Sequence, residues 1–512
     1  MASPHRWVTT LLVSALAVTT LVACGDAEGS VKADVGHEPV PVGQRTPGSA
    51  RPSEAKAPQQ VPLVTDRPRR SPGVVAAGGG DSPYNYGPTL IAENGKYRMW
   101  WCSQLGIAQP PGDDLLHSES ASIDGPFAAP DGSQAMPVLS GSYTGFDGMH
   151  TCDPSVVRVS GTYYLYYTGA AGDHAHGNAI GVATSPDGIV WQRANNGKPI
   201  VSPSYDTIRQ NTYGAGQPSV LYLDGWFYLM FTDTTGQAAG WNGAGQFVLR
   251  SKDPLFTSGV QSLSDKGFSV VSAASAPRSR SLVDAFSADW TWIDALGAFA
   301  IAHETDNGTT LTFWNSDFTA NPYQPVTIAG PWQEGPGLVR APDGHAPVSA
   351  DDPCRRVPVD VVRATVIGAA GAPTDLSHFG LDLMAAQGCA TRQESEVLDG
   401  YAVPSPERTT DLVIGGKVLR VERRSVSDRL AKRVLEDRPP IVDQLPVVAT
   451  LRAGAKTVRS PEGLLGVVLD DGKLWVIGTA EVAQLNSSQI TDISTQEWAR
   501  YERGSDLTAL RR

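Results

Sequence analysis

The sequence has 512 residues, enough for two or three domains, and its apolar share of 41% is that of an ordinary globular protein. It carries 53 acidic and 41 basic residues, a formal net charge of −12, and no segment concentrates lysine and arginine. This balance excludes a nucleic-acid partner, because phosphate backbones are bound by basic surfaces. Neutral ligands suit the charge better.

The first 24 residues have the pattern of an export signal. A weakly basic start precedes an apolar run, 7–22, that is too short and too rich in Thr and Ala for a permanent membrane span. The run ends in Leu21-Val22-Ala23-Cys24, the pattern of a bacterial lipobox, in which the cysteine thiol carries a diacylglycerol anchor. We predict an exported lipoprotein on the extracytoplasmic face of the cell membrane, held by the lipid on Cys24 alone. A plain secretory signal is the alternative.

The segment that follows, 25–80, consists of Pro, Gly, Ala, Ser and charged residues with almost no aromatic residue. A segment of this composition buries too little apolar surface to offset the conformational entropy that it would lose on folding. We predict a disordered tether over residues 25–80.

Residues 81–395 contain a sequence motif that recurs along the chain. GPTLIAENGKYRMWW begins at Gly87, and copies that align without a gap begin at Asp153, Gln217 and Asp289. In each copy a glycine separates two apolar runs, which is typical of a β-hairpin, and a second hairpin-like signature follows. A period of roughly 65 residues with two hairpins predicts four-stranded blades packed around an axis.

A fifth copy, EGPGLVRAPDGHAP, begins at Glu334. We therefore predict an all-β fold, a five-bladed β-propeller over residues 81–395. Four blades with a cap is the competing count.

From Tyr401 onward the sequence no longer follows the repeat. DLVIGGKVLRVE predicts a hairpin, SVSDRLAKRVLED a short amphipathic helix that starts at a serine N-cap, and the stretch around Asp471-Gly472 a meander. We predict a small α+β accessory domain over residues 401–512. It contains no nucleophile elbow, zinc signature, P-loop or dinucleotide fingerprint.

The sequence has five cysteines, and setting aside the lipidated one leaves an even number, which suits an oxidising compartment. Four cysteines allow three pairings. Cys102 ends the second predicted strand of the first blade, and Cys152 immediately precedes the first strand of the next blade. Both can therefore lie at the boundary between these two blades. We predict the disulfides Cys102–Cys152 and Cys354–Cys389.

In a propeller the innermost strands converge at one mouth of the central channel. The aligned starting positions are Gly87, Asp153, Gln217, Asp289 and Gly335, with Glu334 just before the last. The register therefore predicts three carboxylates around one funnel.

The blade pattern resembles the five-bladed propeller glycoside hydrolases, family forty-three and its relatives, over about residues 81–390. The resemblance is carried by Cys152-Asp153-Pro154-Ser155-Val156-Val157, by the Ala183–Gly188 hairpin that ends at Trp191, and by Glu334-Gly335-Pro336. It implies Asp153 as general base, Asp289 as the carboxylate that orients and tunes the acid, and Glu334 as the general acid. This order starts one blade later than in the family, because Gly87 stands where the base is expected. Asp81, just upstream of the first strand, is the alternative base.

His150, Gln217 and Asp81 are the candidates for substrate binding. Gln217 occupies a starting position and cannot titrate, so a hydrogen bond to substrate is its natural role. His150 can donate to a sugar hydroxyl or simply occupy a turn. Each carboxylate also has a structural interpretation, since an Asp before Pro commonly caps a turn.

The predicted function is a surface-anchored glycoside hydrolase that binds an oligosaccharide or polysaccharide and cleaves it by acid/base hydrolysis with water. The resemblance alone implies a pentose- or furanose-containing glycan. A non-catalytic carbohydrate-binding propeller and an envelope interaction scaffold are the rivals. No cofactor is expected, and a central structural ion stays open.

Overall fold

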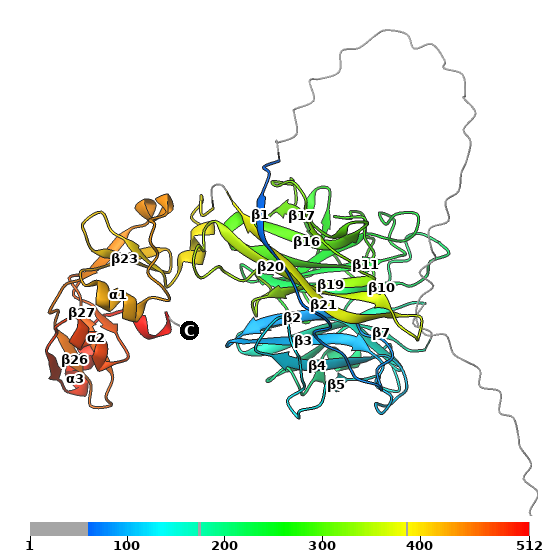
Figure 1. Cartoon of the computed structure of the whole chain (residues 1–512), viewed down its shortest axis with the longest axis horizontal. Coiled ribbons are helices and arrows are strands. Elements are labelled where there is room, and N and C mark those ends of the chain that lie inside the picture. Colours follow the sequence, from blue (N-terminus) through cyan, green and yellow to red (C-terminus); the bar gives the residue numbers. More distant parts are fainter. Residues whose placement is uncertain (1–59, 173–175, 386–387, 511–512) are drawn as a thin grey trace, which may run out of the picture.

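A computed structural model describes residues 60–172, 176–385 and 388–510 (Figure 1). The predicted signal, Cys24 and most of the predicted tether lie outside these residues. The described chain is mostly β-strand with few and short helices, so the all-β prediction is confirmed. None of the described helices is both long and apolar enough to cross a bilayer.

Most strands form antiparallel meanders that follow the sequence repeat. The first two groups are β2 (Tyr86–Glu93), β3 (Lys96–Ser103), β4 (Asp114–Ser120) and β5 (Met136–Leu139), then β6 (His150–Val159), β7 (Thr162–Ala170), β8 (Ala179–Ser185) and β9 (Gln192–Arg193). The next two are β10 (Ala215–Leu223), β11 (Trp226–Asp233), β12 (Gln246–Ser251), β13 (Gln261–Ser264) and β14 (Gly267–Val270), then β15 (Ala288–Ile293), β16 (Ala298–Thr305), β17 (Gly308–Asn315) and β18 (Val326–Ala329). A last group holds β19 (Glu334–Arg340), β20 (Arg356–Ile367), β21 (Pro373–Met384) and the early strand β1 (Val64–Arg70).

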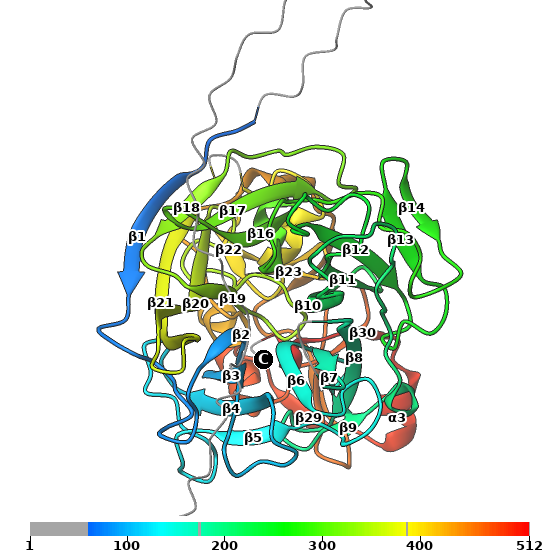
Figure 2. The same ribbon diagram turned by 90° about the vertical axis from the view of Figure 1, so that its right-hand side faces the viewer.

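The first strands of these groups form a closed ring. β2, β6, β10, β15 and β19 contact one another in that order, and β19 also pairs in parallel with β2. Figure 2 shows β2, β6, β10 and β19 around a common centre. Successive copies of the sequence repeat are therefore successive members of one ring. We call the end at which the first strands begin the mouth face.

The predicted hairpin glycines lie in the turns that lead out of the ring. Three turns have positive φ at both central residues, the geometry that matches the twist of paired strands: Asn94-Gly95 (51° and 74°), Ser160-Gly161 (51° and 85°) and Asp224-Gly225 (51° and 80°). The fourth differs, because a 3₁₀ turn, η2 (Asp294–Leu296), precedes Gly297 at φ 56°.

The prediction of a tether up to residue 80 is wrong at its end, because residues 64–70 form β1. This strand pairs antiparallel with β21 and so completes the last group with the earliest described strand. Arg69 donates to the carboxylates of Asp360 and Asp382. Composition missed the strand because ion pairs with distant residues, and not apolar side chains, hold it in place.

Two disulfides are present, and both have the predicted partners. Cys102, in β3, is bonded to Cys152, in β6, with their Cα atoms 4.9 Å apart. Cys354 is bonded to Cys389 with Cα atoms 5.1 Å apart. The first bond joins two neighbouring strand groups immediately before Asp153.

The C-terminal region contains two small sheets and short helices. The sheets hold β22 (Ala402–Pro404), β23 (Thr410–Ile414), β24 (Lys417–Val421) and β25 (Val447–Leu451), and β26 (Thr457–Arg459), β27 (Leu465–Val468), β28 (Leu474–Val476), β29 (Ile490–Asp492) and β30 (Arg503–Asp506). The α-helices are α1 (Arg424–Leu430), α2 (Ala480–Leu485) and α3 (Thr495–Arg500).

Helix α1 is shorter than the predicted helix and has no serine cap, since Arg423 occupies the N-cap position. It ends at Leu430 because the following residues run beside β22, where Val434 bridges to Ala402. Hydrogen bonding to a distant strand therefore overrides local helix propensity there.

The C-terminal region packs on the end of the ring opposite the mouth face. Its 3₁₀ turn η3 (Glu394–Leu398) contacts η2, and Leu398 shares a core cluster with Ile293 and Leu296. Figure 1 shows the region on one side of the ring. The mouth face is consequently turned away from it.

Candidate active site

Four of the five ring strands contain a residue-proline pair in a β-bulge close to their start. The pairs are Gly87-Pro88, Asp153-Pro154, Gln217-Pro218 and Gly335-Pro336, and the strand register shifts at each of them. Proline has no N–H for the ladder, so a bulge is where a strand tolerates it. The residue before each proline is left-handed, with φ of 56°, 49°, 50° and 59° in that order. Asp153 and Gln217 adopt this conformation although they are not glycine, and such local strain concentrates at functional sites.

Crowding requires one of the two glycines of this set, Gly335. A Cβ on Gly335 would lie 2.9 Å from the Cα of Gly87, so the backbones of β19 and β2 touch at the mouth. No side chain fits between them. A Cβ on Gly87 would itself meet only Asp153, with the Oδ1 at 3.4 Å, so it is the left-handed backbone and not crowding that favours glycine there.

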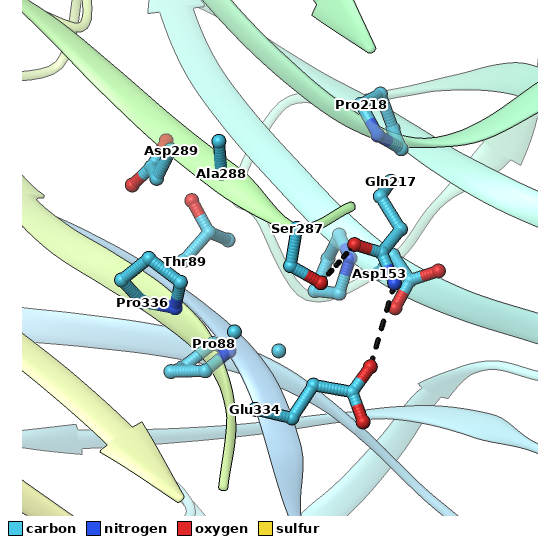
Figure 3. A pocket seen from close by; sticks show the side chains of 13 residues that line it. Pro88, Thr89, Asp153, Gln217, Pro218, Ser287, Ala288, Asp289, Glu334 and Pro336 are labelled. Atoms are coloured by element: carbon cyan, nitrogen blue, oxygen red, sulfur yellow. Dashed lines mark hydrogen bonds between the residues drawn. The ribbon is translucent and has the colours of Figure 1, made fainter. Parts of the chain in front are cut away.

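The five ring strands enclose a cavity of ≈ 40 Å³ at the mouth face (Figure 3). Space of this size holds a few water molecules. The lining residues are Gly87, Pro88, Thr89, Asp153, Pro154, Gln217, Pro218, Ser287, Ala288, Asp289, Glu334, Gly335 and Pro336. Prolines and polar groups dominate this lining, and it includes no aromatic side chain.

Glu334 and Gln217 are brought together in the cavity. The Gln217 Nε2 donates to the Glu334 Oε1 at 3.4 Å, and the Gln217 Oε1 accepts from the Ser287 hydroxyl (Figure 3). These two contacts fix which end of the amide faces the carboxyl group. Gln217 therefore orients Glu334, whatever contact it makes with substrate.

Asp153 lies on the other side of Gln217, and two hydroxyl groups hold it. The Tyr213 hydroxyl donates to the Asp153 Oδ2 at 3.2 Å, and Thr168 supplies a second hydrogen bond. Burial raises the pKa of Asp153 to about 6, while these two hydrogen bonds act in the opposite direction. The carboxylate is still the main form at neutral pH.

Glu334 has the opposite protonation state at neutral pH. Burial and the negative charge of Asp153 raise its pKa to about 8, although the hydrogen bond from Gln217 acts in the opposite direction. The two groups interact, so they titrate as a pair. One cavity thus holds an ionised carboxylate beside a protonated carboxyl group, the arrangement that separates a base from an acid.

Asp289 lines the same cavity, but other groups occupy its oxygens. Its Oδ1 accepts from the Ser219 hydroxyl at 2.5 Å and its Oδ2 from the Leu338 backbone N–H at 2.8 Å. Arg340 lies 3.3 Å from the Oδ1. Figure 3 shows Asp289 well separated from Asp153 and Glu334.

The local backbone explains this difference. Strand β15 has no proline at its start and no bulge, and Asp289 pairs with Ala302 in a regular ladder. The alignment of the repeats is free of gaps, yet the left-handed turn that presents Asp153 and Gln217 to the cavity is missing from this copy. Asp289 instead ties β15 to its neighbours β10 and β19.

Arg340 is fully buried at the ring centre and binds all the other ring strands. It donates to Val220 O at 2.9 Å and Trp290 O at 3.2 Å. It also donates to the Thr89 Oγ1 at 2.9 Å and the Ser155 Oγ at 3.4 Å. The guanidinium group thereby fills the ring centre, so a ligand approaches the cavity from the mouth face.

Two predicted substrate-binding residues do not line the cavity. His150 begins β6 and forms an ion pair with Asp113, with Nδ1 and Oδ2 3.3 Å apart. Burial lowers the pKa of His150, but Asp113 outweighs burial and leaves the pKa above its ordinary value. Asp81 is exposed in a turn, where its carbonyl oxygen accepts from the Gly106 N–H at 3.2 Å. Neither position suits a direct role in the cavity.

Asp113 also lies near Cys102 and Cys152, a grouping with the residue types of a metal site. Both cysteines are consumed by the disulfide and offer no thiolate. The Tyr84 hydroxyl donates to the Asp113 carboxylate. This group is therefore accounted for as a structural cluster.

Four residues of the site went unpredicted: Thr168, Tyr213, Ser287 and Arg340. Tyr213 lies four residues before Gln217, in a loop whose path the sequence does not define. Thr168 lies near the end of β7, one tyrosine-rich strand among several. Only Arg340 carried a signal, because an arginine inside the apolar strand GPGLVR requires buried partners.

No protein-family profile and no curated protein sequence matches the chain. Among solved structures, a family 117 glycoside hydrolase of the marine bacterium Zobellia galactanivorans is similar with a TM-score of 0.42 and 13% identity, covering 62% of this chain and 91% of that one. An α-L-arabinofuranosidase of Podospora anserina, solved with cellotriose, has a TM-score of 0.37 and 13% identity, covering 63% and 98%. The catalytic domain of a family 62 α-L-arabinofuranosidase of Coprinopsis cinerea has a TM-score of 0.37 and 13% identity, covering 64% and 99%. Similarities this low decide neither the fold nor the activity of this chain.

Proposed function

We propose that this protein is a glycoside hydrolase built on a five-bladed β-propeller, with Glu334 as general acid and Asp153 as general base. One observation carries the proposal: two carboxyl groups share a small cavity, and their pKa values of about 6 and about 8 lie on either side of neutrality. Hydrolysis of a glycosidic bond requires this division between an acid and a base.

In the proposed reaction Glu334 gives its proton to the glycosidic oxygen as the bond to the anomeric carbon breaks. A water molecule in the cavity attacks that carbon, and Asp153 accepts a proton from the water. Tyr213 and Thr168 hold the Asp153 carboxylate in place, while Gln217 holds the Glu334 carboxyl group. Exchange with solvent then returns both groups to their starting protonation states.

Asp289 takes a structural role in this proposal. Its contacts with Leu338 and Arg340 fix the ring strands that carry the acid and the neighbouring backbone. The negative charge of Asp153 and the amide of Gln217 replace it in tuning the acid. The proposal thus keeps the roles that the family resemblance implies for Asp153 and Glu334 and changes the role of Asp289.

The wider setting is part of the same proposal. A pentose- or furanose-containing glycan is the substrate that the family resemblance implies. Lipidation of Cys24 would anchor the chain on the extracytoplasmic face of the membrane, with residues 401–512 as an accessory domain. The two disulfides support an oxidising compartment.

The test is a glycan hydrolysis screen with single carboxyl substitutions. Asp153→Asn and Glu334→Gln should each lower the rate by about 10²–10⁴, the contribution of a positioned acid or base. Asp81→Asn is the matched control, since Asp81 is exposed and outside the cavity lining. Azide should rescue a truncated Asp153 variant, because an external anion replaces a base, and should not rescue Glu334→Gln. Hydrolysis at the wild-type rate in both variants contradicts the proposal.

A non-catalytic carbohydrate-binding module is the second candidate. Gln217 and Ser287 favour it, because uncharged polar groups that line the cavity suit hydrogen bonds to sugar hydroxyls without any chemical step. Retention of a glycan by the wild-type protein without release of reducing sugar, under conditions in which the protein is folded, would select this function.

A further inference from the structure

Three aromatic side chains stand in solvent on loops of the mouth face. Trp241 is 92% exposed, and Tyr143 and Tyr205 are each 67% exposed. Tyr143 and Tyr205 lie in the segments that lead into the first strands β6 and β10. Trp241 lies between β11 and β12, and the pairing of Ala215 with Asp233 places this loop at the same end of the sheet. We call these three residues the aromatic rim.

The backbone around Trp241 is held on both sides. Arg209 donates to the carbonyl oxygen of Gly240, and the Asn211 Nδ2 donates to the carbonyl oxygen of Asn242 at 3.0 Å. The loop backbone is therefore held in place, while the indole of Trp241 is exposed to solvent. An indole exposed to this degree contributes little to folding, whereas aromatic rings are the usual anchors of binding surfaces.

The two tyrosines of the rim have a left-handed backbone, with φ of 66° at Tyr143 and 52° at Tyr205. Residues other than glycine adopt this conformation at a cost in free energy. Backbone hydrogen bonds hold both: the Tyr143 N–H donates to Gly148 O at 2.8 Å, and the Tyr205 N–H donates to the Thr235 Oγ1 at 2.9 Å. Hydrogen bonds therefore hold Tyr143 and Tyr205 in a left-handed conformation, and the side chains of both are exposed.

The loops of the rim are continuous with the cavity. The Gly245 N–H donates to Ala285 O at 3.1 Å, two residues before Ser287 in the cavity lining. The loop that carries Tyr205 ends at Tyr213, which donates to Asp153. The segments that carry the rim therefore also position the acid/base pair.

Two properties identify the occupant of the rim. The cavity lining includes no aromatic side chain, so sugar units beyond those held at the acid/base pair find no ring to stack on within it. Gly240 and Asn242, which flank Trp241 in the sequence, carry no charge, and Arg209 and Asp284 near Gly240 have opposite charges, so the loop suits a neutral ligand. The apolar faces of sugar rings are ligands of this kind for an exposed indole.

We propose that the aromatic rim, with Trp241 as its main contact, binds several sugar units of a neutral glycan chain outside the cavity. This inference rests on the proposed function and deepens it: the substrate is a glycan chain whose sugar units extend from the cavity to the rim.

The experiment measures binding separately from hydrolysis. Linear arabino-oligosaccharides and xylo-oligosaccharides of two to six units are titrated calorimetrically into the Glu334→Gln protein, which does not cleave them. Affinity should increase with chain length. Adding Trp241→Ala should weaken binding of the longest chains by about tenfold and leave disaccharide binding unchanged. Trp241→Phe should retain most of the affinity, because it keeps an aromatic face.

Val190→Ala is the matched control, since Val190 is 68% exposed in the turn after β8, at the opposite end of the ring. It should not change the affinity. Thermal unfolding should be the same in all three variants, because each replaces an exposed side chain. If Trp241→Ala binds every chain length like its parent, or the parent binds none of these chains, the inference is overturned.

Failure of the proposed function has a different signature. A wild-type protein that binds long chains through Trp241 and cleaves none of them supports the aromatic rim and rejects the hydrolase. A wild-type protein that cleaves glycans with no dependence on Trp241 supports the hydrolase and rejects the rim.

Discussion

Asp289 and Arg340 form an ion pair at the centre of the ring, with the Asp289 Oδ1 and the Arg340 Nη1 3.3 Å apart. Arg340 is fully buried, and its other hydrogen bonds reach β2, β6 and β10. The carboxylate that the sequence pattern suggests for catalysis therefore neutralises the charge that holds the ring strands together.

Replacing Asp289 should consequently affect folding more than catalysis. Asp289→Asn leaves the buried charge of Arg340 uncompensated, so the free energy of unfolding should fall by about 3–5 kcal/mol, measured by urea denaturation. Asp265→Asn is the control: Asp265 is exposed and lies 3.8 Å from Arg280, and its loss should cost less than about 1 kcal/mol. An Asp289→Asn protein with wild-type stability and no activity would instead give Asp289 a catalytic role.

The pH dependence of kcat/KM should be bell-shaped. Asp153 must be ionised to accept a proton, so activity should be lost as pH falls through about 6. Glu334 must be protonated to donate one, so activity should also be lost as pH rises through about 8. Initial rates between pH 4 and 10 at low substrate concentration measure both limbs for the free enzyme. A flat profile across this interval would reject the acid/base pair.

Tyr213→Phe should move only the acid limb of that profile. The hydrogen bond of 3.2 Å from the Tyr213 hydroxyl stabilises the Asp153 carboxylate, so its loss should raise the pKa of Asp153 by about one unit. Activity then begins at higher pH. Tyr323→Phe removes a comparable hydrogen bond, from the tyrosine hydroxyl to Leu296 O at 3.1 Å, and should leave the acid limb in place. An unshifted acid limb in Tyr213→Phe would show that the hydroxyl does not act on the base.

The two disulfides should contribute similarly to stability and differently to activity. They close loops with sequence separations of 50 and 35 residues. The chain-entropy relation gives about 4 kcal/mol for each. Cys102–Cys152 adjoins Asp153, so replacing both of its cysteines by alanine should also lower kcat, whereas the same change at Cys354 and Cys389 should not. Chemical denaturation and steady-state rates of the two double variants test this, and equal kcat values would contradict it.

The sequence predicted the repeat, the strand pairs and both disulfides, because each depends on local pattern. Alternating apolar runs around Gly95, Gly161 and Gly225 indicate hairpins, and the structure has them with the expected left-handed turns. Strand β1 escaped prediction because its partners lie about three hundred residues away, in β21 and at Asp360. The length of helix α1 was overestimated for a similar reason, because the residues that follow Leu430 form hydrogen bonds beside β22 and not a further helical turn.

The candidate site divides in the same way. The repeat register by itself predicted that Asp153, Gln217 and Glu334 lie at one mouth, because Asp153 and Gln217 occupy the aligned position and Glu334 directly precedes it. Only the tertiary structure decided that Asp289 turns to Arg340, that Tyr213 supports the base, and that His150 and Asp81 lie outside the cavity lining. The physical reason is the local backbone: Asp153 and Gln217 lie in left-handed bulges before proline, whereas Asp289 lies in the regular ladder of β15 and its oxygens bond to β10 and β19. Strand register can be read from sequence period, whereas backbone conformation at one residue and the partners of a buried charge depend on contacts between distant strands.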